Sequence, residues 1–300
     1  MSNFNILLFT LLSLPCWGLC QDLAQIGLLP VRGQVHVLLE MTSGNIGVLH
    51  GKDGFLIIDT QFESHYERIA ARLEEVGQGG VVYAINTHFH YDHADGNKAF
   101  GPEGTTIVAH RNARSRLMTD QRVIVPGLNT TDQKQFPSNA LPSITYDSTM
   151  DLHFNGETIR LHHLENAHTD TDTLVQLVNA NVLHTGDVFV RYGLPYIDTR
   201  NGGSVQGMIR AQSTILSLCN DETLIIPGHG GVCKANEVRM FKANLETIFN
   251  GVKAARAKGL SRESINQSEI IEEVLGDSKG FIPPHTFLSM IQDELDAAHD

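Results

Sequence analysis

The chain has 300 residues, of which 41% are hydrophobic and 19% are charged; these values exclude a wholly disordered protein and suffice for one large domain. Its net charge of −12 makes binding to nucleic acid or to anionic lipid unfavourable, because phosphate recognition needs clustered lysine and arginine. Four cysteines are too few for a disulfide scaffold, whereas 15 histidines, the commonest metal-ligating side chains, point first to a metal site.

Residues 1–20 have the features of a signal peptide. The apolar run 6–14 is too short to span a bilayer, and Gly18 and Cys20 are small residues at the −3 and −1 positions of a cleavage site before Gln21. The segment has no lysine or arginine ahead of the apolar run, so the alternative is an N-terminal helix packed on the domain. No later stretch approaches transmembrane length, and we therefore expect an exported protein without a membrane span, secreted or periplasmic.

Strands and helices alternate along the rest of the chain, and the long segment 120–143, rich in Asn and Pro, is predicted to be a functional or mobile loop. The continuous apolar run 81–85 predicts a strand that is buried on both faces. The predicted strands are 35–41, 46–49, 55–59, 81–85, 106–109, 150–154, 158–164, 173–178, 182–185 and 224–226, and the predicted helices are 65–76, 111–118, 205–218, 236–253 and 284–298. This order indicates an α/β fold of two sheets with helices on their outer faces.

Four candidate metal ligands follow the predicted strand 81–85 within six residues: His88, His90, Asp92 and His93. In extended chain, residues i and i+2 point to the same side, so His88 and His90 can bind one ion together. A turn that begins at Asp92 would carry its carboxylate and the His93 imidazole to a second position beside the first. Imidazole and carboxylate without thiolate suit zinc, with iron or manganese as alternatives.

Three further candidate ligands also follow predicted strands. His168 comes after 158–164, Asp187 after 182–185 and His229 after 224–226, and α/β folds place their sites at the carboxyl ends of strands. The other ten histidines lack partners at ligand spacing, although His184 is close enough in sequence to contact the site. Asp59 either hydrogen-bonds to a ligand loop or caps its own strand.

With these residues in this order, the sequence resembles the metallo-β-lactamase superfamily. The resemblance implies an αββα sandwich over residues 33–255, with 256–300 as a helical extension packed on it. It also implies two zinc ions per chain, the first held by His88, His90 and His168, the second by Asp92, His93 and His229, and both bridged by Asp187. The best-known antibiotic-destroying branch has a cysteine ligand that this chain lacks, although a β-lactamase branch without a thiol ligand exists. The ligand set therefore resembles glyoxalase II-like and lactonase-like members.

The resemblance implies a hydrolase in which a metal-bridging hydroxide attacks a small carbonyl substrate, a cyclic amide or ester such as a β-lactam or lactone. Asp92 is then the catalytic carboxylate that accepts or relays the proton. Tyr192 and Tyr196 either bind substrate or only pack, and Arg122 and Lys134 of the long loop are candidates for binding a substrate carboxylate. The alternatives are a thioester hydrolase of the glyoxalase II type, a mononuclear-iron oxygenase of the same fold, and a non-catalytic protein.

Overall fold

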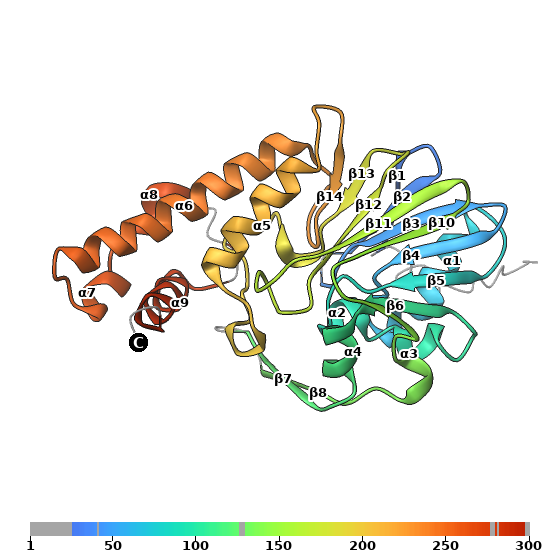
Figure 1. The fold of residues 1–300 in the computed structure, drawn as a ribbon, viewed down its shortest axis with the longest axis horizontal. Coiled ribbons are helices and arrows are strands. Elements are labelled where there is room, and N and C mark those ends of the chain that lie inside the picture. Colours follow the sequence, from blue (N-terminus) through green and yellow to red (C-terminus); the bar gives the residue numbers. More distant parts are fainter. Residues whose placement is uncertain (1–25, 41, 126–129, 277–279, 281, 298–300) are drawn as a thin grey trace, which may run out of the picture.

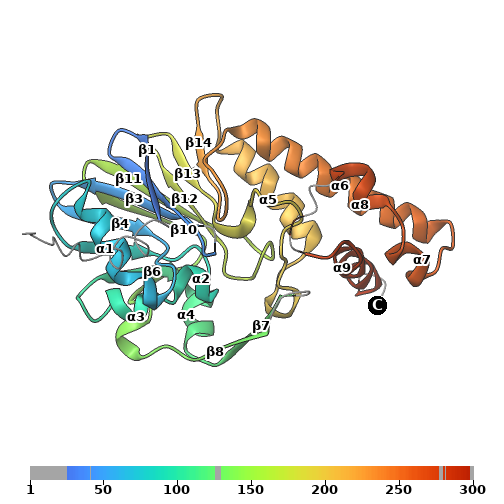
Figure 2. The ribbon, with the colours of Figure 1, turned by 180° about the vertical axis from the view of Figure 1, so that it is seen from behind.

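The computed structural model describes residues 26–40, 42–125, 130–276, 280 and 282–297, so the predicted signal peptide lies outside the described residues. Two sheets face each other in the middle of the molecule (Figures 1 and 2). The larger, in the order β1-β2-β3-β4-β5-β6-β9, consists of β1 (Gly27–Arg32), β2 (Val35–Leu39), β3 (Ile46–Gly51), β4 (Gly54–Ile58), β5 (Val81–Ile85), β6 (Thr106–His110) and β9 (Ile144–Tyr146). The smaller, in chain order, consists of β10 (Thr149–Phe154), β11 (Glu157–His163), β12 (Thr173–Leu177), β13 (Val182–His184) and β14 (Leu224–Ile226).

Helices cover the outer face of each sheet, which confirms the predicted αββα sandwich (Figure 1). On the side of the larger sheet lie α1 (Tyr66–Glu74), α2 (Tyr91–Ala94), α3 (Asn97–Phe100) and α4 (Arg111–Leu117). On the side of the smaller sheet lie α5 (Val205–Ser217) and α6 (Ala235–Ala257), followed by α7 (Arg262–Asn266), α8 (Ile270–Leu275) and α9 (Pro284–Ala297). Short 3-10 turns are η2 (Glu63–His65), η3 (Ser138–Ala140), η4 (Gly186–Val188) and η5 (Thr199–Asn201).

The alternation of side chains along β4 shows how the layers are held together. Leu56 and Ile58 point between the two sheets, where they join the cluster that includes Leu161 of the smaller sheet. Phe55 and Ile57 point to the other side and pack in the cluster beneath α1. Because successive strand residues face opposite sides, an all-apolar strand binds both layers, and each buried side chain of this size contributes about 1.5–3 kcal/mol.

Two local predictions need correction. The strand 81–85 is buried on both faces only in its second half, since Ala84 and Ile85 are fully buried whereas Val82 is 37% exposed. The segment 120–143 contains a hairpin of β7 (Gln121–Ile124) and β8 (Thr130–Gln133) rather than only loop. The hairpin is anchored by buried Val123 and by Gln133, whose Nε2 donates to the carbonyl oxygen of Phe89 at 2.9 Å.

The C-terminal helices extend beyond the sandwich, to the left in Figure 1, yet they are tied to α5 and α6. Phe287, Leu288 and Ile291 of α9 are fully buried in the same cluster as the inner faces of α5 and α6. The Glu294 carboxylate accepts hydrogen bonds from the Ser204 hydroxyl and from the amide nitrogen atoms of the first turn of α5. Within the described residues, no helix is both long and apolar enough to cross a membrane.

Candidate metal centre

The loop after β5 brings four of the predicted ligands to the edge of the sandwich. His88 and His90 lie in the segment that follows the strand, and α2 starts at Tyr91, one residue before the predicted turn. Asp92 and His93 therefore fall in the first turn of α2 and are carried next to the two preceding histidines. Because the helix starts directly after an extended segment, the six residues 88–93 can supply ligands to two neighbouring positions.

The other three predicted ligands arrive at the same place from the smaller sheet. His168 follows β11, Asp187 lies in η4 after β13, and His229 follows β14. Three groups of ligand atoms each lie within 4.8 Å of one another: His88, His90 and His168; His88, His93 and Asp187; and Asp92, His93 and His229. The structure thus brings together all seven side chains that the sequence pattern singled out.

The first group has three imidazoles whose outer nitrogen atoms are occupied by protein partners. Nδ1 of His88 lies 3.1 Å from the Thr87 hydroxyl, and Nδ1 of His168 lies 2.8 Å from the carbonyl oxygen of Tyr196. Nε2 of His90 lies 3.0 Å from the carboxylate of Asp198.

The inner nitrogen atoms of the same three rings face one another. Nδ1 of His90 and Nε2 of His168 are 2.9 Å apart, and the fully buried Nε2 of His88 has no hydrogen-bond partner among the described residues. Lone pairs that converge in this way, each on a ring oriented by a partner on its far side, fit a bound cation.

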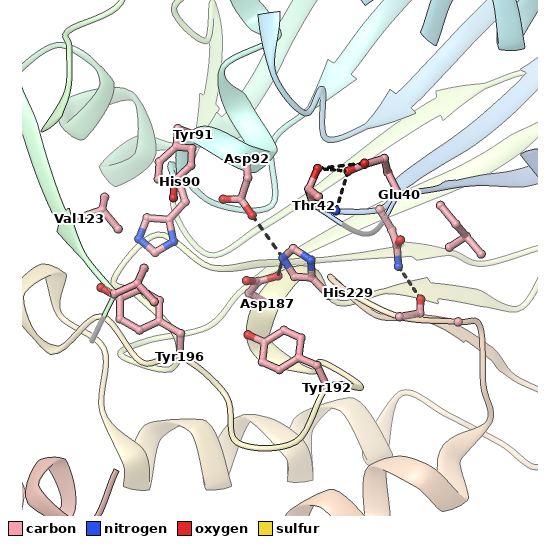
Figure 3. A pocket seen from close by; sticks show the side chains of 15 residues that line it. Glu40, Thr42, His90, Tyr91, Asp92, Val123, Asp187, Tyr192, Tyr196 and His229 are labelled. Carbon is pink, nitrogen blue, oxygen red and sulfur yellow. Dashed lines mark hydrogen bonds and ion pairs between the residues drawn. The ribbon is translucent and has the colours of Figure 1, made fainter. Parts of the chain in front are cut away.

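The second group combines two imidazoles with two carboxylates. Nε2 of His93 lies 3.1 Å from Oδ1 of Asp187, and Nε2 of His229 lies 3.3 Å from Asp92 and 3.4 Å from Asp187 (Figure 3). Oδ2 of Asp187 is also 3.9 Å from Nε2 of His168, so this carboxylate lies between the two groups. Its position is the one that a ligand shared by two cations would need.

The two groups differ in electrostatics. Burial and the neighbouring imidazoles lower the pKa of His88 well below its usual value and that of His168 to about 4. Burial also acts on His93 and His229, but the nearby carboxylates outweigh it and raise the pKa of His93 well above its usual value and that of His229 to about 9. The same contacts hold the pKa of Asp187 well below that of an ordinary carboxyl, despite its burial. At neutral pH His88 and His168 are therefore neutral, the state in which an imidazole binds a metal ion, whereas His93 and His229 carry protons that a bound cation would displace.

Asp59 serves the ligand loop rather than its own strand, which resolves the alternative left open by the sequence. Its backbone has a φ of +68°, and its carboxylate accepts from the amide and the hydroxyl of Thr87, both at 2.7 Å. It also lies 2.8 Å from Nδ1 of His93. His184 has a related role, since its Nδ1 accepts from the amide of Gly186 at 3.2 Å and so orients the turn that carries Asp187.

Sequence reasoning missed two carboxylates that position ligands. Asp198 holds the ring of His90, and Asp172 accepts from the backbone amides of His168 and Thr169 at 2.7 and 2.9 Å. The spacing of Asp172, four residues after His168 in a Thr- and Asp-rich stretch, is typical of a side chain that caps a turn and was a usable signal. Asp198 lies 108 residues from His90, and no local pattern marks it.

A cavity of about 660 Å³ opens beside the seven side chains, and Tyr192 and Tyr196 both line it (Figure 3). Tyr196 packs its ring 5.8 Å from that of His90, so it both lines the cavity and supports the ligand. Arg122 and Lys134 do not line the cavity; they are exposed and pair with Asp132 and Asp120.

Comparison with protein families matches residues 40–229 to the model of the metallo-beta-lactamase superfamily. The chain belongs to the metallo-beta-lactamase superfamily. A comparison with curated proteins found no match. Among solved structures, this superfamily member is similar to the DIM-1 metallo-beta-lactamase, with a TM-score of 0.60 and 17% identity over 74% of this chain and 98% of that one.

Two other solved structures share the fold. A metallo-beta-lactamase from Pontibacter korlensis matches with a TM-score of 0.60 and 15% identity over 74% of this chain and 99% of that chain. The sec-alkylsulfatase Pisa1 from Pseudomonas sp. matches with a TM-score of 0.64 and 15% identity over 90% of this chain and 50% of that chain. At these identities the likeness establishes the fold, and the chemistry has to be argued from the site.

Proposed function

We propose that this chain is a hydrolase that depends on two zinc ions, one held by His88, His90 and His168 and the other by Asp92, His93 and His229, with Asp187 between them. The observation that carries the proposal is the arrangement of the first three rings, whose outer nitrogen atoms are occupied while the inner ones converge. A purely structural cluster of histidines would give every buried inner nitrogen a partner, whereas Nε2 of His88 has none among the described residues.

Bound divalent cations would supply Lewis acidity and a water of lowered pKa, so that no serine or cysteine nucleophile is needed. The residues of the chain fix the geometry: Asp59 orients His93, and Asp198 orients His90. Asp92 is the most accessible carboxylate of the centre, with 20% of its side chain exposed against 8% for Asp187. It is therefore the group that accepts or relays a proton from the cavity.

The proposed substrate is a small carbonyl compound, a cyclic amide or ester of the β-lactam or lactone type. Support comes from a cavity of a size suited to a small molecule, with the carboxylate and imidazole groups on one wall. Two of the structural neighbours carry the name metallo-beta-lactamase.

The test is metal analysis of protein purified without chelator, followed by hydrolysis assays on β-lactams, lactones and thioesters. We expect about two zinc ions per chain. Asp92→Ala and His229→Ala should each lower the rate at least about a hundredfold, because the cations contribute several kcal/mol to the transition state. His153→Ala, which removes an exposed histidine of β10, is the matched control and should be unaffected. One iron per chain would instead support the oxygenase alternative, and hydrolysis that survives both substitutions would refute the ligand assignment.

Export is part of the same proposal and rests on the apolar run 6–14 and the small residues at 18 and 20. The full-length chain expressed in a secreting host should appear outside the cytoplasm, with Gln21 as the first residue found by N-terminal sequencing. Retention of residues 1–20 in a cytoplasmic protein would contradict it.

A further inference from the structure

The cavity has two walls of different character. On the side of the β7–β8 hairpin it is lined by Tyr91, Val123, Val125 and Tyr196, and Figure 3 shows the labelled members of this set on the left of the candidate metal centre. We call these four residues the apolar wall. An elongated molecule whose reacting carbonyl lies at the centre would therefore place one end against aromatic and branched aliphatic side chains.

The opposite wall carries a negative charge. Glu40, Thr42 and Asn45 line the cavity there. Figure 3 shows Glu40 and Thr42 to the right of the centre. The Glu40 carboxylate accepts from the amide and hydroxyl of Thr42 and from the hydroxyl of Ser43, all within 2.9 Å, and these bonds lower its pKa even though burial raises it. Glu40 is therefore ionised at neutral pH and gives this wall a negative charge of its own.

Away from the candidate metal centre, the described lining of the cavity offers no permanently cationic side chain. Among the described residues that line it there is no lysine or arginine, and residues 41 and 126–129, which neighbour lining residues in the sequence, are uncharged. Arg191 does not line the cavity, and its guanidinium donates to the carbonyl oxygen of the lining residue Gly231 at 2.9 Å. Recognition of a substrate carboxylate would need a guanidinium or ammonium group facing the cavity.

Provided that the chain is the hydrolase proposed above, we propose that its substrates are uncharged esters or lactones whose apolar acyl chain packs against the apolar wall, and that the cavity discriminates against chains ending in a carboxylate. Each methylene removed from water there improves binding about fourfold. A carboxylate in the same place would lose its hydration without gaining a partner. Glu40 adds repulsion from the other side.

The test compares two chromogenic esters that differ only at the chain end: p-nitrophenyl octanoate and the mono-p-nitrophenyl ester of octanedioic acid. The zinc-loaded protein should give a kcat/KM at least about tenfold higher for the neutral ester. Val125→Lys places an ammonium at the partly exposed end of the apolar wall and should reduce this ratio about tenfold. Val178→Lys, at a residue 37% exposed that does not line the cavity, is the matched control and should leave the ratio unchanged.

Equal kcat/KM for the two esters would overturn the inference. A preference for the acidic ester that disappears in Arg191→Gln would also overturn it and would assign carboxylate recognition to that arginine. If neither ester is hydrolysed above the background rate, the hydrolase proposal fails, and calorimetric titration with octanamide and with octanedioic acid monoamide still decides the selectivity. Binding of the neutral amide at least about tenfold tighter supports the apolar wall as its site, and equal binding refutes it.

Discussion

Gly44→Ala is the sharpest perturbation of the candidate centre, because it adds one methyl group and replaces no ligand. A Cβ at this position would lie 2.2 Å from Cε1 of the His93 ring and 2.6 Å from its Nε2. Ordinary contact begins at 3.4 Å, so the imidazole would have to retreat by about 1.2 Å. The ring is also tethered, since Nδ1 lies 2.8 Å from the Asp59 carboxylate.

A displacement of that size moves Nε2 of His93 away from Asp187 and Asp92 and spoils the second group of ligands. Misplacement by about 1 Å can cost a hundredfold in rate. We therefore expect Gly44→Ala to bind about one metal ion instead of two and to lose about a hundredfold in hydrolysis. The assay is metal content by mass spectrometry together with kcat/KM on the best substrate of the panel.

Gly80→Ala is the matched control, since a Cβ there would meet nothing within 4 Å. Thermal unfolding separates a local effect from failure to fold: the melting temperature of Gly44→Ala should stay within a few degrees of the parent when both are measured without metal. Retention of two metal ions and of a rate within twofold of the parent would refute the reasoning, because the ring could then move at no cost to the site.

Three further outcomes are expected. Asp198→Asn removes the charge that orients His90 and should weaken zinc affinity about 10–100-fold in competition with a chelator; unchanged affinity would show that Asp198 is structural only. His110 stacks on His163 at 3.5 Å, and burial with that neighbour lowers its pKa to about 4. The neutral His110 side chain contributes its full share to the free energy of unfolding above a pH of about 6.5, the pKa of histidine in the unfolded chain. As the pH falls towards 4 this contribution is lost, and the free energy of unfolding decreases by at most about 3 kcal/mol. His110→Asn keeps an acceptor for the amide of Asn112 and should flatten this pH dependence in urea unfolding, whereas an unaltered slope would contradict the assignment. Glu294→Gln weakens the hydrogen bonds to the first turn of α5 and should destabilise the fold by about 1 kcal/mol in the same assay, and no change would mean that water replaces the carboxylate.

Local patterns predicted much of the fold. The short apolar runs that predict β2, β3 and β4 consist of neighbouring residues in the sequence, and the helical spacing that predicts α1 is equally local. The extent to which β5 is buried could not be predicted in the same way, because the sequence of residues 81–85 does not show how far the neighbouring layers cover the strand. The β7–β8 hairpin was missed because its strands are only four residues each and its anchors, Val123 and Gln133, find their partners elsewhere in the chain.

The candidate ligands were predictable for a related reason. Each follows a strand, and the edge at which strands end is fixed by the fold, so seven residues spread from 88 to 229 could be assigned to one place. The residues that position those ligands do not follow strands in this way. Asp198 reaches His90 across 108 positions, and Gly44 makes room for His93 from a loop between two strands. The ligands of this centre are thus encoded by local sequence, whereas its geometry depends on contacts between distant segments. Asp198→Asn and Gly44→Ala, which leave every ligand in place, are for that reason the variants that separate a functional centre from a mere cluster of histidines.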